Sequence, residues 1–447
     1  MQFTISATDE ILVSHSGLAL VGALLQGTNL RSRAGDIRLG DRKRPAVSHG
    51  DVVTAMIGLL CLGKPDFDAI EAFREDDFFR QALGLESVPS EGTLRQRLDE
   101  LEGRCDRIVR EESADMIARQ APALTRCRED WIALDIDVSP FDNSGTKKEG
   151  VSWTYKKVDG YAPIFAYLAE YEIHCQLRRG SQHCQDGTPE FLDEAIAYAR
   201  RVTQGKILVR MDSGNDDIEN LRRCTKNRVD WLIKRNLRQE SLEDWLLEAE
   251  AFGEHAQPRA GKEVWTGETW KMRDDKSYRI VFEVIRRTST PDGQKLLLPE
   301  IEVATYWTSL KLPAKTIIEL YRQHGTSEQY HSEIKSDMDL ERLPSGKFAT
   351  NALVLSLGLV AYNVLRLCGQ TSLQQNRQLP EEKRMPIRKA VTRRRLRSVI
   401  QDLIYLAARL TRHAHRVGLS FWRSNPWHGV WGSLYEQFTG RSSLATP

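Results

Sequence analysis

The stretch that decides the fold is WIALDIDV at residues 131–138, together with KILVRMDSG at residues 206–214. Both are apolar runs typical of buried β-strands, and they end on Asp137 and Asp212 respectively. If the two strands are neighbours in one sheet, their terminal carboxylates lie side by side. Such carboxylates repel each other, so their natural partner is a hard divalent cation such as Mg²⁺. The alternative is that each aspartate only serves the turn after its strand.

Strands and helices alternate around these two stretches. Residues 188–199 have apolar residues at helical spacing, and Thr188 is placed to cap that helix. The alternation between residues 128 and 235 predicts a mixed α/β sheet. Further strands are expected at 161–171, 172–177 and 231–234, and a further helix at 218–228.

The rest of the chain divides into segments of different character. Helices are predicted on both sides of the α/β part, whereas turn signals and β-rich runs alternate after residue 235. We therefore expect an α/β domain in two parts, interrupted by a β-rich insertion and flanked by helical N- and C-terminal regions. The expected segments are 1–127, 128–235, 236–312, 313–370 and 371–447.

One helix is expected over residues 314–336, and one of its faces is unusually polar. A stripe of phenol, imidazole, carboxylate and amine suits a metal and a phosphodiester better than an apolar core. Glu333 lies about 140° from Glu328 around the same helix, so it is expected to reach solvent or basic neighbours rather than a metal. At 100° per residue the stripe spans about 60° and consists of Tyr321, His324, Glu328 and Lys335.

These motifs resemble those of a large branch of bacterial insertion-sequence DDE transposases. The spacing Tyr321-x2-His324-x3-Glu328-x6-Lys335 resembles the family signature Y-x2-R-x3-E-x6-K. His324 stands where the family has arginine, and a histidine binds phosphate more weakly at neutral pH unless its pKa is raised. The resemblance covers roughly residues 45–420.

Three further blocks support the same resemblance. Residues 136–139 (IDVS) resemble the block that carries the family's first acid, and residues 210–214 (RMDSG) resemble the one that carries the second acid in one subgroup. Residues 340–345 (LERLPS), followed by a helix that holds 361–363 (AYN), also resemble that subgroup.

The resemblance implies an RNase H-like domain in which Asp137, Asp212 and Glu328 form a catalytic triad and hold two Mg²⁺ or Mn²⁺ ions. The implied reaction is hydrolysis at transposon ends followed by strand transfer into target DNA. The implied partners are double-stranded DNA, as inverted repeats and target, and a second copy of the chain in a homodimer on DNA. The residues implied to hold phosphate are Tyr321, His324 and Lys335.

Two aspects of the function stay open at this stage. The branch is similar to enzymes that cut the second strand through a DNA hairpin, in which aromatics of the insertion hold a flipped base. Trp265, Trp270 and Trp307 are the candidates, with a place in the core as the alternative for each. The competing functions are a metal-dependent nuclease without strand transfer and a DNA-binding regulator with a degenerate α/β domain.

Charge clusters in two places, although the whole chain carries 64 Lys and Arg against 62 Asp and Glu. Between residues 377 and 423 there are 13 basic and three acidic residues, and we expect this segment to contact DNA phosphates. A helix opened by Ser90, with Arg and Gln in its first turns, is the second candidate for DNA contact. For both, the alternative is a solvated helix face. The proposed phosphate contacts in the basic segment are Arg393, Arg394, Arg395 and Arg397.

The remaining composition suits a protein of a reducing cytoplasm, and the resemblance implies a bacterial protein associated with the nucleoid. Seven cysteines without a CxxC motif suit a reducing compartment. No signal peptide is expected, and no stretch approaches the about 20 apolar residues of a membrane span, so no membrane partner is predicted. The nearest alternative to an oxygen-liganded metal is zinc at His174-Cys175 and His183-Cys184, whose spacing fits poorly.

Overall fold

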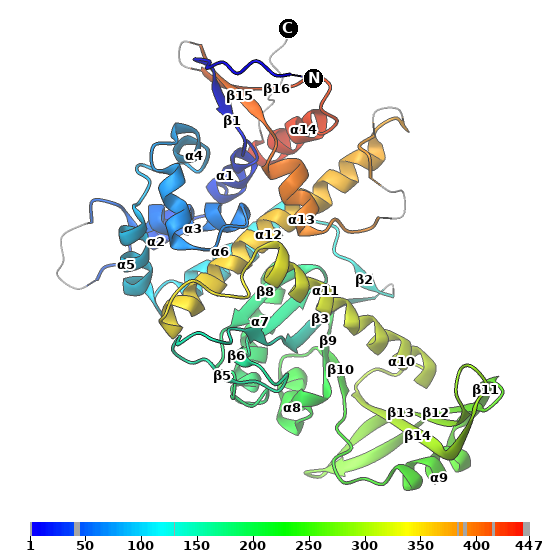
Figure 1. Ribbon diagram of the computed structural model, residues 1–447. Helices are drawn as coiled ribbons and strands as arrows, with labels where there is room; N and C mark the ends of the chain where they lie inside the picture. The colour runs from blue at the N-terminus through cyan, green and yellow to red at the C-terminus, as the bar shows by residue number, and fades with distance from the viewer. Residues whose placement is uncertain are drawn as a thin grey trace.

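The computed structural model describes residues 2–39, 45–128, 130–381, 384–387, 391–413 and 416–440. A mixed sheet with the strand order β8-β7-β3-β9-β10 forms its centre (Figure 1). β3 pairs in parallel with β9, and β9 with β10, whereas β7 is antiparallel to both β3 and β8. Three antiparallel strands followed by two parallel ones define an RNase H-like sheet. The strands are β3 (Trp131–Val138), β7 (Ile164–Leu168), β8 (Tyr171–Gln176), β9 (Lys206–Met211) and β10 (Asp230–Lys234).

The strand expected over residues 161–171 is instead divided, which corrects the sequence-based prediction. It consists of the end of β6 (Asp159–Tyr161) and of β7, with Pro163 between them. Proline has no backbone N–H to donate to a ladder, so it favours the break. β6 turns away from the main sheet and pairs with β4 (Phe141–Asp142) and β5 (Ser152–Trp153).

Helices connect and cover the sheet. α7 (Thr188–Val202) links β8 to β9, and α8 (Ile218–Lys226) links β9 to β10. α12 (Phe348–Gln378) packs on β8 and also on the N-terminal helices α3 and α6, so it joins the two regions (Figure 1). The N-terminal helices are α1 (Leu18–Gln26), α2 (Leu30–Gly35), α3 (His49–Cys61), α4 (Asp77–Ala82), α5 (Glu91–Leu101) and α6 (Asp106–Gln120), with the 3₁₀-helix η1 (Phe67–Phe73).

α12 is longer and more apolar than expected. By length and composition it is sufficient to cross a membrane, contrary to the expectation from sequence that no such stretch exists. However, 94% of its most apolar window is buried inside the protein. Its composition therefore follows from its place in the core, where it contacts helices on one side and the sheet on the other.

The insertion extends the central sheet. β14 (Lys295–Thr308) pairs with β10, and β13 (Lys276–Ser289), β12 (Lys262–Arg273) and β11 (Glu254–Arg259) follow in antiparallel order. α9 (Leu242–Phe252) packs on this part of the sheet.

The C-terminal region is not wholly helical, which corrects a second prediction. β15 (Ala408–His413) and β16 (Arg416–Phe421) form a three-stranded sheet with β1 (Ile11–Val13) near the two chain ends (Figure 1). In the first half of β15 the buried Ala408 and Leu410 lie on either side of the exposed Arg409, and such a period of two suits a strand with one face on the core. The C-terminal helices are α13 (Leu396–Val399), continued by the π-turn Ile400–Ile404, and α14 (His428–Thr439).

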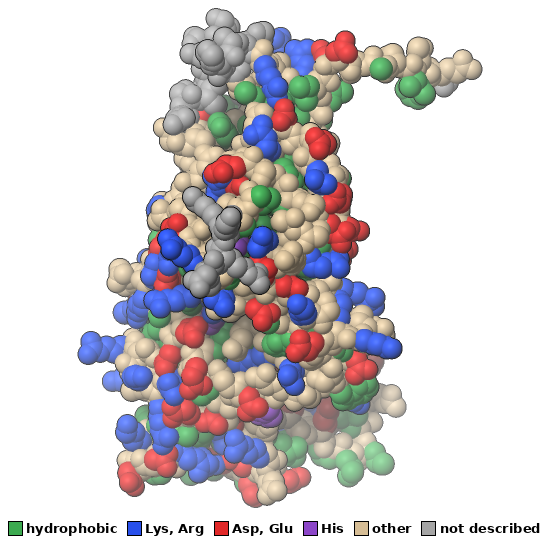
Figure 2. Space-filling view, turned by 90° about the vertical axis from the view of Figure 1, so that its left-hand side faces the viewer, with side chains coloured by type: hydrophobic (Ala, Val, Ile, Leu, Met, Phe, Trp, Pro, Cys, Tyr) green, Lys and Arg blue, Asp and Glu red, His purple; other side chains and the backbone are tan. Residues whose placement is uncertain are grey.

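Charged side chains are mixed on the face seen in Figure 2. Basic and acidic groups are interspersed there and form no continuous basic field. On α5, Arg95 pairs with Glu91 and Arg97 with Glu100, and Ser90 caps the helix as predicted by accepting from the Thr93 N–H. Whether this helix contacts DNA stays a prediction.

One carboxyl group in the core should make the stability depend on pH. Glu172 on β8 is buried, and neither of its carboxyl oxygens meets a nitrogen or oxygen donor within the described part of the chain. Burial raises its pKa from the ordinary 4.5 to about 8. The folded state therefore binds a proton that the unfolded state releases above pH 4.5, so the stability should fall as pH rises from about 4.5 to about 8.

The Glu172→Gln variant should lose this contribution. Glutamine has the same size but no ionisable group. Between pH 5 and pH 8, the free energy of unfolding should therefore fall by roughly 4 kcal/mol less in the variant than in the parent. Urea unfolding at several pH values measures the difference, and other titrating groups cancel between the two proteins. Parallel pH profiles for parent and variant would show that Glu172 is ionised in the folded protein.

Candidate active site

Asp137 and Asp212 are neighbours, as the strand ends predicted. β3 and β9 are parallel and in register up to Ile136 and Met211, so each aspartate is the next residue on its strand. Burial and the negative charge of Asp212 raise the pKa of Asp137 to about 6. The two carboxylates therefore repel each other at neutral pH, as expected for a pair that shares a cation.

The helix expected over 314–336 is irregular. It consists of α10 (Ala314–Arg322), a 3₁₀ turn (Gln323–Thr326), α11 (Ser327–Ser332) and a π-turn (Glu333–Asp337). Nevertheless its predicted polar stripe faces one cleft of about 750 Å³, which opens at the ends of β3 and β9. The predicted residues that line this cleft are Asp137, Asp212, Tyr321, His324, Glu328 and Lys335.

His324 is held by a buried ion network below the cleft. Its Nδ1 lies 2.9 Å from Asp135, which also accepts two hydrogen bonds from Arg210 at 2.6 and 2.7 Å. Burial disfavours the charged ring, yet the Asp135 carboxylate outweighs it and raises the pKa of His324. The protein itself thus favours the cationic form that phosphate binding requires.

Several cleft residues were missed by the sequence analysis. Tyr155 and Lys156 come from the turn between β5 and β6, and Lys234 ends β10. His331 lies 3.7 Å from Asp137, and its burial lowers its pKa to about 3, so it is neutral. In the sequence only one feature points to these residues, the adjacent basic residues Lys156 and Lys157, and no spacing rule connects them to the strand ends.

The donor chemistry of the cleft suits a hard divalent cation. Asp137, Asp212 and Glu328 supply carboxylate oxygens, and burial together with these three charges raises the pKa of the Tyr155 phenol between them. Asp212 is oriented by hydrogen bonds from Gly214 N–H and from the Asn215 amide at 2.8 Å. Within the described residues no three His, Cys, Asp or Glu are already grouped as metal ligands.

The zinc alternative has no support in the geometry. His174 is stacked on Phe191 at 4.2 Å and lies 3.2 Å from Glu194, and its pKa is lowered by burial to about 4. Cys184 donates to the backbone carbonyl of Gly214 at 2.7 Å. All seven cysteines are free thiols, in agreement with the expectation of no disulfide framework.

Comparison with known proteins decides the family. The family described as "Transposase DDE domain group 1" matches residues 2–440 of this chain. The protein is a DDE transposase. As members of this family generally do, the transposase is expected to use divalent metal ions.

Comparisons with individual proteins add little to this assignment. No curated protein matches the transposase. A similar solved structure is that of the "piggyBac transposase synaptic complex with hairpin DNA", with a TM-score of 0.39 and 10% identity. The match covers 97% of this chain and 83% of that one.

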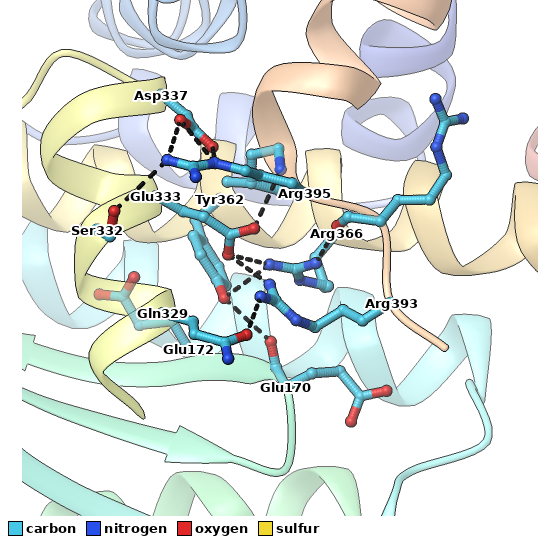
Figure 3. A network of polar contacts seen from close by, with 12 residues as sticks. Glu170, Glu172, Gln329, Ser332, Glu333, Asp337, Tyr362, Arg366, Arg393 and Arg395 are labelled. Atoms are coloured by element: carbon cyan, nitrogen blue, oxygen red, sulfur yellow. Dashed lines mark hydrogen bonds and ion pairs between the residues drawn. The ribbon is translucent and has the colours of Figure 1, made fainter. Parts of the chain in front are cut away.

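Glu333 lies away from the cleft, as predicted, and of the two expected surroundings, solvent or basic neighbours, the structure has the second. Figure 3 shows its carboxylate between two guanidinium groups, those of Arg366 on α12 and Arg393. Its other oxygen accepts from the Leu396 N–H at 3.1 Å. Glu333 is 1% exposed and Arg366 is fully buried, so the π-turn after Glu328 is fixed by a buried salt bridge.

Within the basic segment, Arg394 is too buried to contact DNA phosphates, which corrects the prediction for that residue, while phosphate contact by Arg393, Arg395 and Arg397 stays a prediction. Arg394 is buried and binds Asp402, while Arg393 donates to Glu333 at 2.6 Å. Arg395 and Arg397 retain exposed side chains, but both pair with the buried Asp337. Figure 3 shows the first of these pairs. These ion pairs join the segment to the π-turn, and about half of the side-chain surface of Arg395 and Arg397 remains exposed. Lys383, Arg388 and Lys389 of this segment lie outside the described residues.

The tryptophans of the insertion separate into two groups. Trp265 and Trp307 are buried, each 5% exposed, and belong to the core, as the alternative interpretation held. Trp307 also donates to Asp216 at 2.7 Å and lies under the Arg235 guanidinium. Trp270 is 60% exposed and is the only one of the three predicted residues with a ring open to solvent.

Proposed function

We propose that this transposase cuts DNA at transposon ends and joins the freed ends to target DNA. The observation that carries the proposal is the meeting of Asp137, Asp212 and Glu328 in one open cleft at the strand ends of an RNase H-like sheet. Three carboxylates with basic side chains around them suit phosphodiester chemistry, which needs both metal-binding oxygens and groups that hold phosphate.

The three acids would hold divalent ions, Mg²⁺ or in its place Mn²⁺. Two such ions, when bound, activate the attacking water or DNA 3′-hydroxyl and stabilise the leaving oxygen. Asp212 is presented in one orientation by the Gly214 and Asn215 donors, so little reorganisation is needed on that side. Glu328 sits on the exposed side of α11 and closes the set.

Basic and hydroxyl groups around the acids would hold the DNA backbone. Lys335 donates to the Pro140 carbonyl at 2.5 Å, which places its ammonium beside the loop after β3. His324 uses Nδ1 for Asp135 and therefore offers Nε2 to a phosphate oxygen. Tyr321, Lys156 and Arg322 line the same cleft and complete the proposed phosphate-binding set.

The partners follow from this chemistry. The substrate would be double-stranded DNA, as the element's inverted repeats and as target, and pairing of two ends would require a homodimer on the DNA. We propose the bacterial nucleoid in the cytoplasm as the site of action.

Incubation of the purified protein with DNA that carries the flanking repeats tests the proposal. With Mg²⁺ we expect cuts at the repeat boundaries and, with a supercoiled plasmid added, products in which repeat ends are covalently joined to the plasmid. Sequencing of the junctions should show direct repeats of constant length. Cuts without any joined product would favour the nuclease, and binding without cuts would favour the regulator.

A further inference from the structure

A turn beside the cleft carries two exposed aromatic rings. Trp153 at the end of β5 is 60% exposed and Tyr155 is 64% exposed, whereas Thr154 between them is 2% exposed. Alternation of this kind places both rings on the outer side of the hairpin and anchors it through Thr154. Large apolar rings on the surface beside a catalytic cleft mark a contact site.

Tyr155 is fixed at one end and open on its ring. Its hydroxyl donates to the backbone carbonyl of Val138 at 2.9 Å, which is the residue after Asp137. The hydroxyl is partly buried, and Tyr155 lines the same cleft as Asp137, Asp212 and Glu328. The ring face above it therefore stands directly beside the place where a scissile phosphate would bind.

The turn itself is rigid. The Thr154 N–H and hydroxyl both donate to the Val158 carbonyl at 2.9 Å, and the Lys157 N–H donates to Thr154 at 3.0 Å. Lys157 takes the left-handed conformation, with φ of 62°, that this tight turn requires. Below the hairpin, Gly180 lies so close to the Ser152 carbonyl that a Cβ would collide with it.

Positive charge accompanies the two rings. Lys156 lines the cleft. Burial lowers the pKa of His331 and the pKa of Lys335, and the positive charge of Lys156 lowers both further. Aromatic faces interleaved with basic side chains are the combination that proteins use to bind single-stranded nucleic acid.

We infer that Trp153 and Tyr155 form a stacking platform for unpaired bases of the DNA strand next to the scissile phosphate, while Lys156 binds that strand's backbone. The inference rests on the proposed function and identifies a part of its substrate site. Stacking on a ring tolerates every base, so the platform would act on the flanking strand whatever its sequence. Tyr155 lines the acidic cleft together with three lysines, and Trp153 is two residues away on the same hairpin, which favours DNA over a protein segment as the occupant.

Binding measurements without metal test the platform apart from the chemistry. The probes are a fully paired duplex and the same duplex with a single-stranded oligo(dT) tail, both in EDTA. The double variant Trp153→Ala/Tyr155→Leu should bind the tailed duplex about 10- to 100-fold more weakly than the parent, because each lost stack weakens binding severalfold or more. Its affinity for the fully paired duplex should change less than about twofold.

Two further variants control for loss of structure and for general surface effects. Tyr155→Phe keeps the ring but loses the hydroxyl bond to Val138, so it should bind the tailed duplex more tightly than the double variant. Phe252→Ala removes an aromatic that is 80% exposed at the end of α9 and should change neither affinity. Thermal unfolding of all variants should match the parent, since Trp153 and Tyr155 contribute little buried area.

The outcomes distinguish this inference from the proposed function. The platform is overturned if the double variant binds the tailed duplex with unchanged affinity, or if it loses equal affinity for both probes. Either result counts against the platform even when the parent cuts its DNA ends with Mg²⁺. A selective loss on the tailed duplex supports the platform, even when the parent fails to cut its ends and the proposed function is therefore wrong.

Discussion

Glu328→Gln should abolish metal-dependent cleavage while DNA binding survives. The substitution keeps the size of the side chain but removes a negative charge and a carboxylate oxygen, so two aspartates would remain to hold the metal. Loss of a metal ligand should lower the rate by about a thousandfold or more, because the ions stabilise the charge that develops in the reaction. Cleavage should be followed with Mg²⁺ and with Mn²⁺, and binding by gel shift in EDTA.

Glu319→Gln is the matched control for this experiment. Glu319 lies in α10, is exposed and is outside the cleft, so the same chemical change there should leave the rate within about twofold of the parent. If Glu328→Gln turns over like the control, the third member of the triad has been assigned wrongly.

Glu333→Gln should destabilise the protein severely, in contrast to the small effect that its helical phase suggested. The substitution removes the only carboxylate that Arg366 contacts in the described part of the chain and leaves that buried guanidinium uncompensated. Breaking one partner of a buried ion pair costs about 3–5 kcal/mol. Urea unfolding should therefore show a large shift of the midpoint, with intact secondary structure in water.

The double variant Glu333→Gln/Arg366→Met provides the control. Removal of both charges leaves no uncompensated ion at the centre of the network, so the double variant should be more stable than Glu333→Gln alone. If Glu333→Gln unfolds at the parent's midpoint, the network in Figure 3 does not stabilise the fold. Reduced cleavage at equal stability would instead indicate that Glu333 positions α11.

The strand ends and the polar stripe were predictable because they depend on local pattern. β3 has the predicted bounds, and Asp137 and Asp212 meet because parallel neighbours end at the same edge of a sheet. The polar stripe survives the irregular helix because Tyr321, His324 and Glu328 precede the π-turn. The five-segment division of the chain stays a prediction.

The errors concern features that depend on partners far away in the sequence. The sequence does not show that Glu333 lies in the core until α12 supplies Arg366, and Arg394 looks free until Asp402 pairs with it. β15 has its partner strand β1 almost 400 residues earlier, as the pairing of Leu410 with Ile11 shows. Local charge density and spacing contain no information about such partners.

The pairing of β1 with β15 and β16 also constrains how the protein can be made. While the ribosome is still synthesising the middle of the chain, residues 11–13 have no strand to pair with, so the emerging N-terminal helices must fold with one open backbone edge. The sheet closes only after residue 421 has left the ribosome. A product that stops before β15 keeps that edge unpaired, and an unpaired strand edge favours aggregation.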